Sequence, residues 1–153
     1  MATVNRATTP AHHHRSGAIT LAAILYCWFG LAFLISSLLI VISALRNGEL
    51  PVVLGIEMLA GPFSERLGLG AALAATVPWG VVNILEVLAG YWLWKSRKHG
   101  AKLGLVLFPT GMIFWIGYAL PIMAVIGPLR VLLLAMGWRA LRSGVIETIG
   151  QEK

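Results

Sequence analysis

The chain has 153 residues, of which 58% are hydrophobic and only 12% are charged, and its formal net charge is +6. A soluble domain of this size could not bury so much apolar surface, so the composition excludes a water-soluble globular protein and predicts a bilayer around the apolar runs. The basic residues flank those runs, and no basic patch is interleaved with aromatic residues in a polar module, which excludes nucleic acid as a partner.

Residues 1–17 are polar and show no apolar periodicity, so we expect a mobile cytoplasmic tail. Residues 18–45 contain no charged side chain. A helix of that length is about 42 Å long, more than the ~30 Å hydrocarbon layer, so it would tilt or project from the membrane. The apolar region of a cleaved signal peptide has only about 7–15 residues, and we therefore expect a retained first span.

Residues 50–63 are apolar but too few to span a bilayer, and they contain prolines, glycines and Glu57. Their apolar side chains recur near one face at helical spacing, which predicts an interfacial or re-entrant helix after the first span.

Residues 67–94 form the second predicted span. Its end is rich in aromatic residues typical of a headgroup interface, namely Tyr91, Trp92 and Trp94.

The last apolar stretch, from residue 103 to residue 141, would be close to 60 Å long as a single helix, about twice the hydrocarbon thickness. It must therefore contain two spans, predicted at residues 101–119 and 121–141. The break is expected between Tyr118 and Pro121, because Tyr118 is typical of an interface and Pro121 can begin a new helix. The predicted fold class is an all-α, integral membrane four-helix bundle within residues 18–142, followed by a cytoplasmic tail at 143–153.

The distribution of basic residues tests this count. With four spans and a cytoplasmic N-terminus, the outer segments hold only Arg46 and Arg66. The cytoplasmic segments hold Arg6, Arg15, Lys95, Arg97, Lys98, Lys102, Arg139, Arg142 and Lys153. Three spans would place Arg139 and Arg142 outside, against the positive-inside rule. The sequence thus predicts a multi-pass protein of the cell membrane with both termini in the cytoplasm.

The polar residues inside the spans are the candidate site: Asn83 and Glu86 in the second span and Arg130 in the fourth. A charge at such a depth costs on the order of 2.5–3.5 kcal/mol, so these groups should face the bundle interior and have partners. Counted from the cytoplasmic ends, Glu86 lies about 12 Å deep and Arg130 about 16 Å deep, which allows them to pair. Gly90 continues the stripe of Asn83 and Glu86 and would let a neighbouring helix approach closely.

Several interpretations of these charges remain open. A Glu86–Arg130 pair can simply fix which helices pack together, or Glu86 can bind a cation or relay a proton. Alternatively, Arg130 extends to an interface and Glu86 is protonated.

Two prolines and a tryptophan are candidates for lining a cavity. Pro78 and Pro109 interrupt the second and third spans, and broken helices line binding sites in transporters, although they also occur as structural kinks. Trp79 lies at mid-membrane rather than in an aromatic belt, where an indole either lines a cavity or fills the core.

No metal, cofactor or catalytic group is predicted. His12, His13 and His14, whether native or an added tag, lie in a flexible tail that fixes no coordination geometry. The single cysteine, Cys27, cannot form an intramolecular disulfide and is expected to be an apolar packing residue. The sequence contains no G-x-S-x-G, H-E-x-x-H or phosphate-binding glycine motif, so we expect no enzymatic activity.

Trp79, Glu86 and Gly90, at spacings of seven and four residues, resemble the first helix of the small multidrug-resistance exporters. Members of that family are also four-helix membrane proteins and use a membrane carboxylate. The resemblance covers about a dozen residues and falls in the second span rather than the first. This chain also has a longer tail and an extra interfacial segment, and we do not carry the family's function over to it.

Two functions follow as hypotheses. The first is a non-catalytic membrane protein, either an accessory subunit of a larger complex or a self-associating bundle, because small residues suited to helix packing are plentiful. The alternative is a small ion- or proton-coupled transporter that uses Glu86.

Overall fold

The computed structural model describes residues 16–48, 52–53, 56–57 and 61–141. Four of its helices are long and apolar enough to cross a membrane, namely Gly17–Asn47, Gly68–Trp94, Lys98–Gly117 and Met123–Ala140. The elements in chain order are α1 (Gly17–Asn47), β1 (Val52–Val53), β2 (Ile56–Glu57), α2 (Pro62–Trp94), α3 (Lys98–Gly117), α4 (Met123–Gly137) and the 3₁₀ turn η1 (Trp138–Ala140). The predicted fold class is confirmed: four potential spans, with a short helix between the first and the second.

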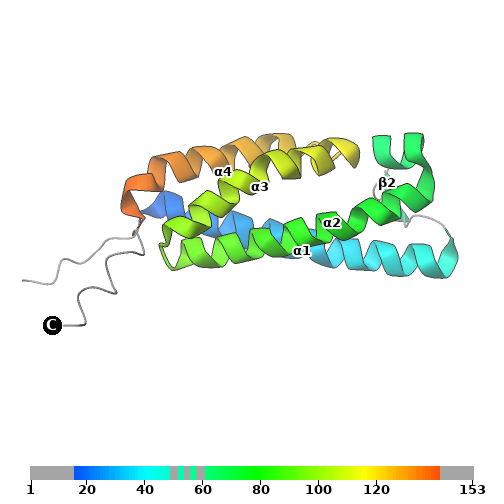
Figure 1. The fold of residues 1–153 in the computed structure, drawn as a ribbon, viewed down its shortest axis with the longest axis horizontal. Coiled ribbons are helices and arrows are strands. Elements are labelled where there is room, and N and C mark those ends of the chain that lie inside the picture. The colour runs from blue at the N-terminus through cyan, green and yellow to red at the C-terminus, as the bar shows by residue number, and fades with distance from the viewer. Residues whose placement is uncertain (1–15, 49–51, 54–55, 58–60, 142–153) are drawn as a thin grey trace, which may run out of the picture.

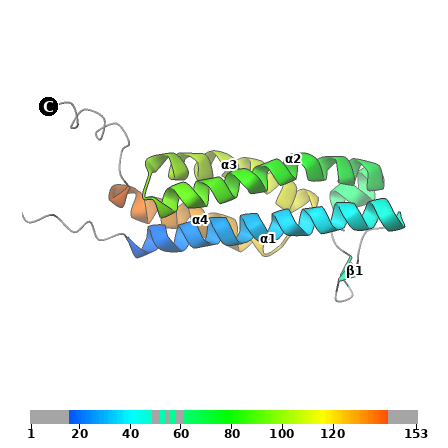
Figure 2. The same ribbon diagram turned by 90° about the horizontal axis from the view of Figure 1, so that it is seen from below.

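The helices run alternately up and down along the long axis (Figures 1 and 2). α1 packs against α2 and α4, and α3 packs against the same two helices. The start of α1, the turn from α2 to α3 and the end of α4 lie at one end of the bundle, on the left in Figure 1. We call it the basic end, because Lys95, Arg97, Lys98, Lys102 and Arg139 are in this turn, in the first turns of α3 and in η1. Arg46 and Arg66 lie in the last turn of α1 and at the start of α2, at the opposite end.

The connection from α1 to α2 differs in detail from the predicted segment 50–63. Val52–Val53 and Ile56–Glu57 pair as antiparallel strands, with Val53 opposite Ile56. Side chains branched at Cβ favour such pairing over a helix. The short helix comes later, at residues 62–67, and the other residues between 49 and 60 lie outside the described part of the chain.

Gly68 separates this short helix from the long span of α2. Its backbone has φ +82° and ψ 168°, a conformation that is open to glycine and strongly disfavoured for residues with a Cβ. At the start of the short helix, the Gly61 N–H donates to Ser64 Oγ at 3.1 Å, and Ser64 Oγ donates to the Gly61 carbonyl at 3.0 Å. Gly68 therefore lets the chain change direction before it enters the bundle.

Large apolar side chains cover the outer surface. Trp28 on α1, Val77 on α2, Ile116 on α3 and Met136 on α4 each have about two-thirds of their surface exposed, between 67% and 68%. Exposing so much apolar surface to water would be strongly unfavourable. In a bilayer the same surface contacts apolar lipid chains instead of water. The exposed faces of all four helices therefore suit contact with lipid chains.

The buried side chains form two clusters along the axis. The cluster near the basic end contains Ile19, Ala22, Ala23, Tyr26, Ala89, Leu93, Ala101, Leu133, Leu134 and Leu141. The second, which we call the aromatic cluster, contains Ile40, Trp79, Val82, Leu107, Phe114 and Tyr118. Glu86 stands one helical turn from Val82 of the aromatic cluster and one from Ala89 of the other, so the polar groups of α2 lie where the two clusters meet.

The break in the last apolar stretch lies at residues 118–122, between the end of α3 at Gly117 and the start of α4 at Met123. The Leu120 N–H donates to the Trp115 carbonyl at 2.8 Å and the Met123 N–H to the Leu120 carbonyl at 3.1 Å, which closes a tight connection. The sequence placed this break at 118–121.

Candidate functional site

Glu86 and Arg130 lie together in the interior. Arg130 Nη1 donates to Glu86 Oε1 at 3.0 Å and joins α4 to α2. Only 3% of the Glu86 surface and 1% of the Arg130 surface is exposed. Two opposite charges so far from water attract each other strongly, and each would be costly without the other.

α1 supplies three further contacts of Arg130. Arg130 Nη2 donates to the Leu25 carbonyl oxygen at 3.0 Å. The guanidinium carbon lies 4.7 Å from the centroid of the Tyr26 ring and 5.3 Å from that of Phe29. A cation is attracted to the negative face of an aromatic ring, more so when water is excluded. One guanidinium on α4 therefore binds groups of two other helices, α1 and α2.

The polar cluster also contains hydrogen-bonding capacity that the protein does not use. Among the described residues, Asn83 Nδ2, Glu86 Oε2 and Arg130 Nε are buried and have no hydrogen-bond partner. Asn83 is 2% exposed and precedes Glu86 by one turn of α2. The cluster thus has two donors and one carboxylate acceptor that could bind a small polar species.

Two glycines allow α1 and α2 to meet closely beside this cluster. A Cβ built at Gly90 would lie 2.9 Å from the Cys27 nitrogen and 3.0 Å from the Ala23 carbonyl oxygen, both on α1. A Cβ at Gly30 would lie 3.0 Å from the Asn83 carbonyl oxygen. Gly90 therefore has the close neighbour expected from the stripe, and Cys27 is part of that packing surface.

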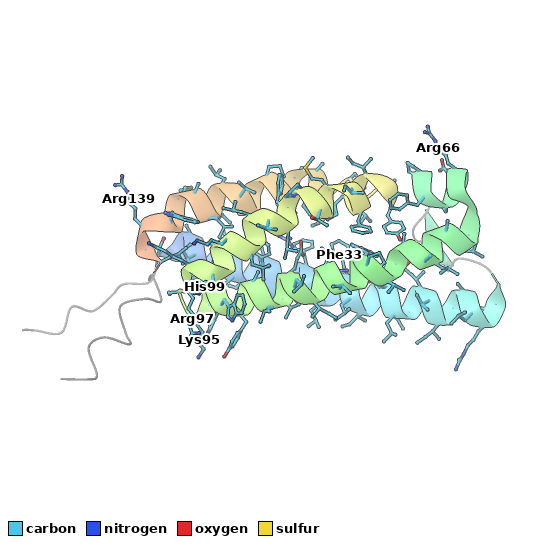
Figure 3. The ribbon with its side chains drawn as sticks, viewed as in Figure 1. Phe33, Arg66, Lys95, Arg97, His99 and Arg139 are labelled. Atoms are coloured by element: carbon cyan, nitrogen blue, oxygen red, sulfur yellow. The ribbon has the colours of Figure 1, made fainter. Side chains whose placement is uncertain are left out.

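The structure separates the three candidates for lining a cavity. Trp79 is 2% exposed, and its ring centroid lies 5.0 Å from that of Tyr118 and 5.6 Å from that of Phe33. Phe33 lies in the middle of the bundle (Figure 3). Pro78 and Pro109 are exposed on the outer surface. Trp79 thus fills the core, and neither proline lines either of the hollows described next.

Two hollows open between α3 and α4. One, of about 590 Å³, lies at the end opposite the basic end. It is lined by Met112, Trp115, Ile116, Ala119, Leu120, Pro121 and Ala124. The other, of about 470 Å³, lies towards the basic end and is lined by Leu105, Val131, Ala135, Trp138 and Arg139. Neither contains Glu86, Arg130 or Asn83.

Within the described ranges, no group of three His, Cys, Asp or Glu side chains is placed to hold a metal ion. His12, His13 and His14 lie outside those ranges. The pairing of Glu86 with Arg130 that the sequence allows is present as a hydrogen-bonded ion pair.

Sequence reasoning missed the contribution of α1 to the site: the Leu25 carbonyl and the rings of Tyr26 and Phe29. Tyr26 carried a usable signal, since it lies about 14 Å along α1 from Gly17, deeper than the headgroup region where tyrosine is usually found. The Leu25 carbonyl carried none, because every residue has one. No known protein family, curated protein or solved structure matches this chain.

Proposed function

We propose that this chain is a non-catalytic protein of the cell membrane that acts by assembly, either as an accessory subunit of a larger membrane complex or as a self-associating bundle. The proposal rests on one observation: the two buried charges are bound to each other and to other groups inside the protein. Arg130 is bound by Glu86, the Leu25 carbonyl and two aromatic rings. A carrier instead needs its carboxylate to be reached from water and to exchange partners.

The outer surface supports the same proposal. Apolar side chains on all four helices are free to contact lipid or another membrane helix. In a bilayer, helix association depends on close packing and interhelical hydrogen bonds rather than on the hydrophobic effect. A bundle whose two buried charges are paired with each other can therefore present its whole outer face to partners.

We further propose that the basic end faces the cytoplasm, which places both termini there. Five described basic residues lie at this end, against Arg46 and Arg66 at the other. Positive charge near the ends of spans is retained on the cytoplasmic side during insertion.

The proposal is tested by the size of the particle in gently solubilised membranes. A tagged full-length chain is expected to migrate on native gels as a discrete species well above its own 16.5 kDa, after allowance for detergent. The double variant Glu86→Gln/Arg130→Gln should keep that assembly, because a neutral pair still fills the space between the helices. A strictly monomeric particle at all protein concentrations would contradict the proposal.

One observation favours the alternative, a small ion- or proton-coupled transporter. Glu86 Oε2, Asn83 Nδ2 and Arg130 Nε are buried without partners among the described residues, so Glu86 retains one oxygen for a proton or a cation. In proteoliposomes this function predicts proton or cation flux that Glu86→Gln abolishes while the protein remains folded. Flux that is absent from the native chain would remove the alternative.

A further inference from the structure

The hollow near the basic end is an apolar groove that ends at a cation. It measures about 470 Å³ and lies between α3 and α4, which diverge towards this end of the bundle (Figure 1). Four of its lining residues are apolar, Leu105, Val131, Ala135 and Trp138, and the fifth is Arg139. Leu105, Ala135 and Arg139 are exposed, so the groove opens on the side of the bundle.

The groove follows the direction of the helices. Val131, Ala135 and Arg139 recur every four residues and lie on one face of the α4–η1 segment, over about 12 Å. On α3, Lys102 and Leu105 share a face, with the exposed Lys102 one turn nearer the basic end. The apolar groove therefore leads to Arg139, and α3 carries a second cation, Lys102, at the same end of the bundle.

An apolar groove that ends at a cationic side chain matches an amphiphile with an apolar chain and an anionic headgroup. Arginine and lysine bind phosphate by charge-assisted hydrogen bonds, and tryptophan is enriched at the depth of lipid headgroups. The larger hollow at the opposite end has no charged lining residue, so it has no group that would bind an anionic headgroup. Charge complementarity thus distinguishes the groove from this larger hollow.

We infer that this groove binds an anionic phospholipid. An acyl chain lies along Leu105, Val131 and Ala135, and the phosphate is bound by Arg139, with Lys102 as the second cation. Anionic lipids are abundant in the cytoplasmic leaflet, which is the leaflet that the basic end would meet in the proposed orientation. The inference concerns the groove alone and does not depend on whether the chain is an accessory subunit or a transporter.

The test is lipid binding to the purified full-length chain in a neutral detergent. Phosphatidylglycerol and phosphatidylcholine with identical acyl chains are titrated, and native mass spectrometry counts the lipids retained. We expect one tightly retained phosphatidylglycerol per chain, with much weaker binding of phosphatidylcholine. Arg139→Gln should weaken the affinity for phosphatidylglycerol about tenfold, because a charge-assisted hydrogen bond to phosphate is lost. Lys102→Gln should weaken it less.

The matched control is Arg97→Gln. Arg97 is exposed at the same end, but it projects from the opposite side of the bundle from Arg139 (Figure 3) and does not line the groove. This variant removes the same charge and should change the affinity less than twofold. Ala135→Trp fills the groove from an exposed position and should weaken binding with all charges kept. If that variant does not fold, the charge variants carry the test alone.

Four outcomes would overturn the inference. An equal loss of affinity in Arg97→Gln and Arg139→Gln would mean diffuse attraction to the basic end. Equal retention of both lipids would remove the role of charge. Competition by glycerol phosphate, which has no acyl chain, as strong as that by phosphatidylglycerol would indicate an anion site alone. A concentration-dependent dimer that Ala135→Trp disrupts, with lipid binding unchanged, would make the groove an interface between copies.

Discussion

Replacing Glu86 by Gln would leave Arg130 charged in an interior where 1% of its surface is exposed. The guanidinium would keep its hydrogen bond to the Leu25 carbonyl and its contacts with the Tyr26 and Phe29 rings, but these groups carry no net charge. Breaking a buried ion pair by removing one partner costs about 3–5 kcal/mol. Because arginine cannot shed its proton, we expect Glu86→Gln to fall in the upper part of that range.

The reciprocal change, Arg130→Gln, should cost less. The Glu86 carboxyl left behind can take up a proton and become neutral, an escape that a guanidinium does not have. The double variant Glu86→Gln/Arg130→Gln leaves no buried charge and should regain much of the loss. The expected coupling free energy is about 1–3 kcal/mol, typical of residues in direct contact.

The measurement is the free energy of unfolding of the four proteins in mixed detergent micelles, followed by tryptophan fluorescence. Arg97→Gln is the matched control, since it removes an exposed arginine in the turn between α2 and α3 and should change stability by less than about 0.5 kcal/mol. Strictly additive losses in the cycle would refute the reasoning, because partners joined at 3.0 Å must deviate from additivity. A double variant less stable than either single variant would refute it as well.

Three further predictions address topology and packing. Tags on both termini and in the Lys95–Lys102 loop should all report the cytoplasm, and a tag accessible from outside at any of these places would contradict the four-span topology. Gly90→Val should destabilise the bundle by about 1–3 kcal/mol in the same unfolding assay, because its side chain would meet the backbone of α1. Gly80→Val should have a much smaller effect, because a Cβ at Gly80 would meet no atom outside its own stretch of helix within 4 Å. Tyr118→Phe removes a buried hydroxyl that donates to a carbonyl of α2 at 2.9 Å and should cost about 1 kcal/mol, and an unchanged stability would show that this bond contributes nothing.

The sequence alone determined the number of spans and the depth of the charged residues. A long uncharged apolar run such as residues 18–45 is stable only in lipid, and its number of residues gives the length of the helix relative to the thickness of the bilayer. The break near Pro121 followed from the same measure, since the last apolar stretch was too long for one crossing. The sequence could suggest a pair of Glu86 and Arg130 because opposite charges at similar depth in a low-dielectric medium stabilise each other.

Tertiary structure decided which face of each helix is buried. Trp79 is in the core and Pro78, its neighbour in sequence, is on the surface, although the sequence made both of them candidates for lining a cavity. Hydropathy cannot separate the two because lipid is as apolar as a protein core, so the inward and outward faces of a span have the same composition. For the same reason α1, apolar on every side, gave no sign that the Leu25 carbonyl and the Tyr26 ring would surround Arg130. Such contacts depend on how the helices are rotated against one another, and that rotation is set only when the side chains of all four helices pack together.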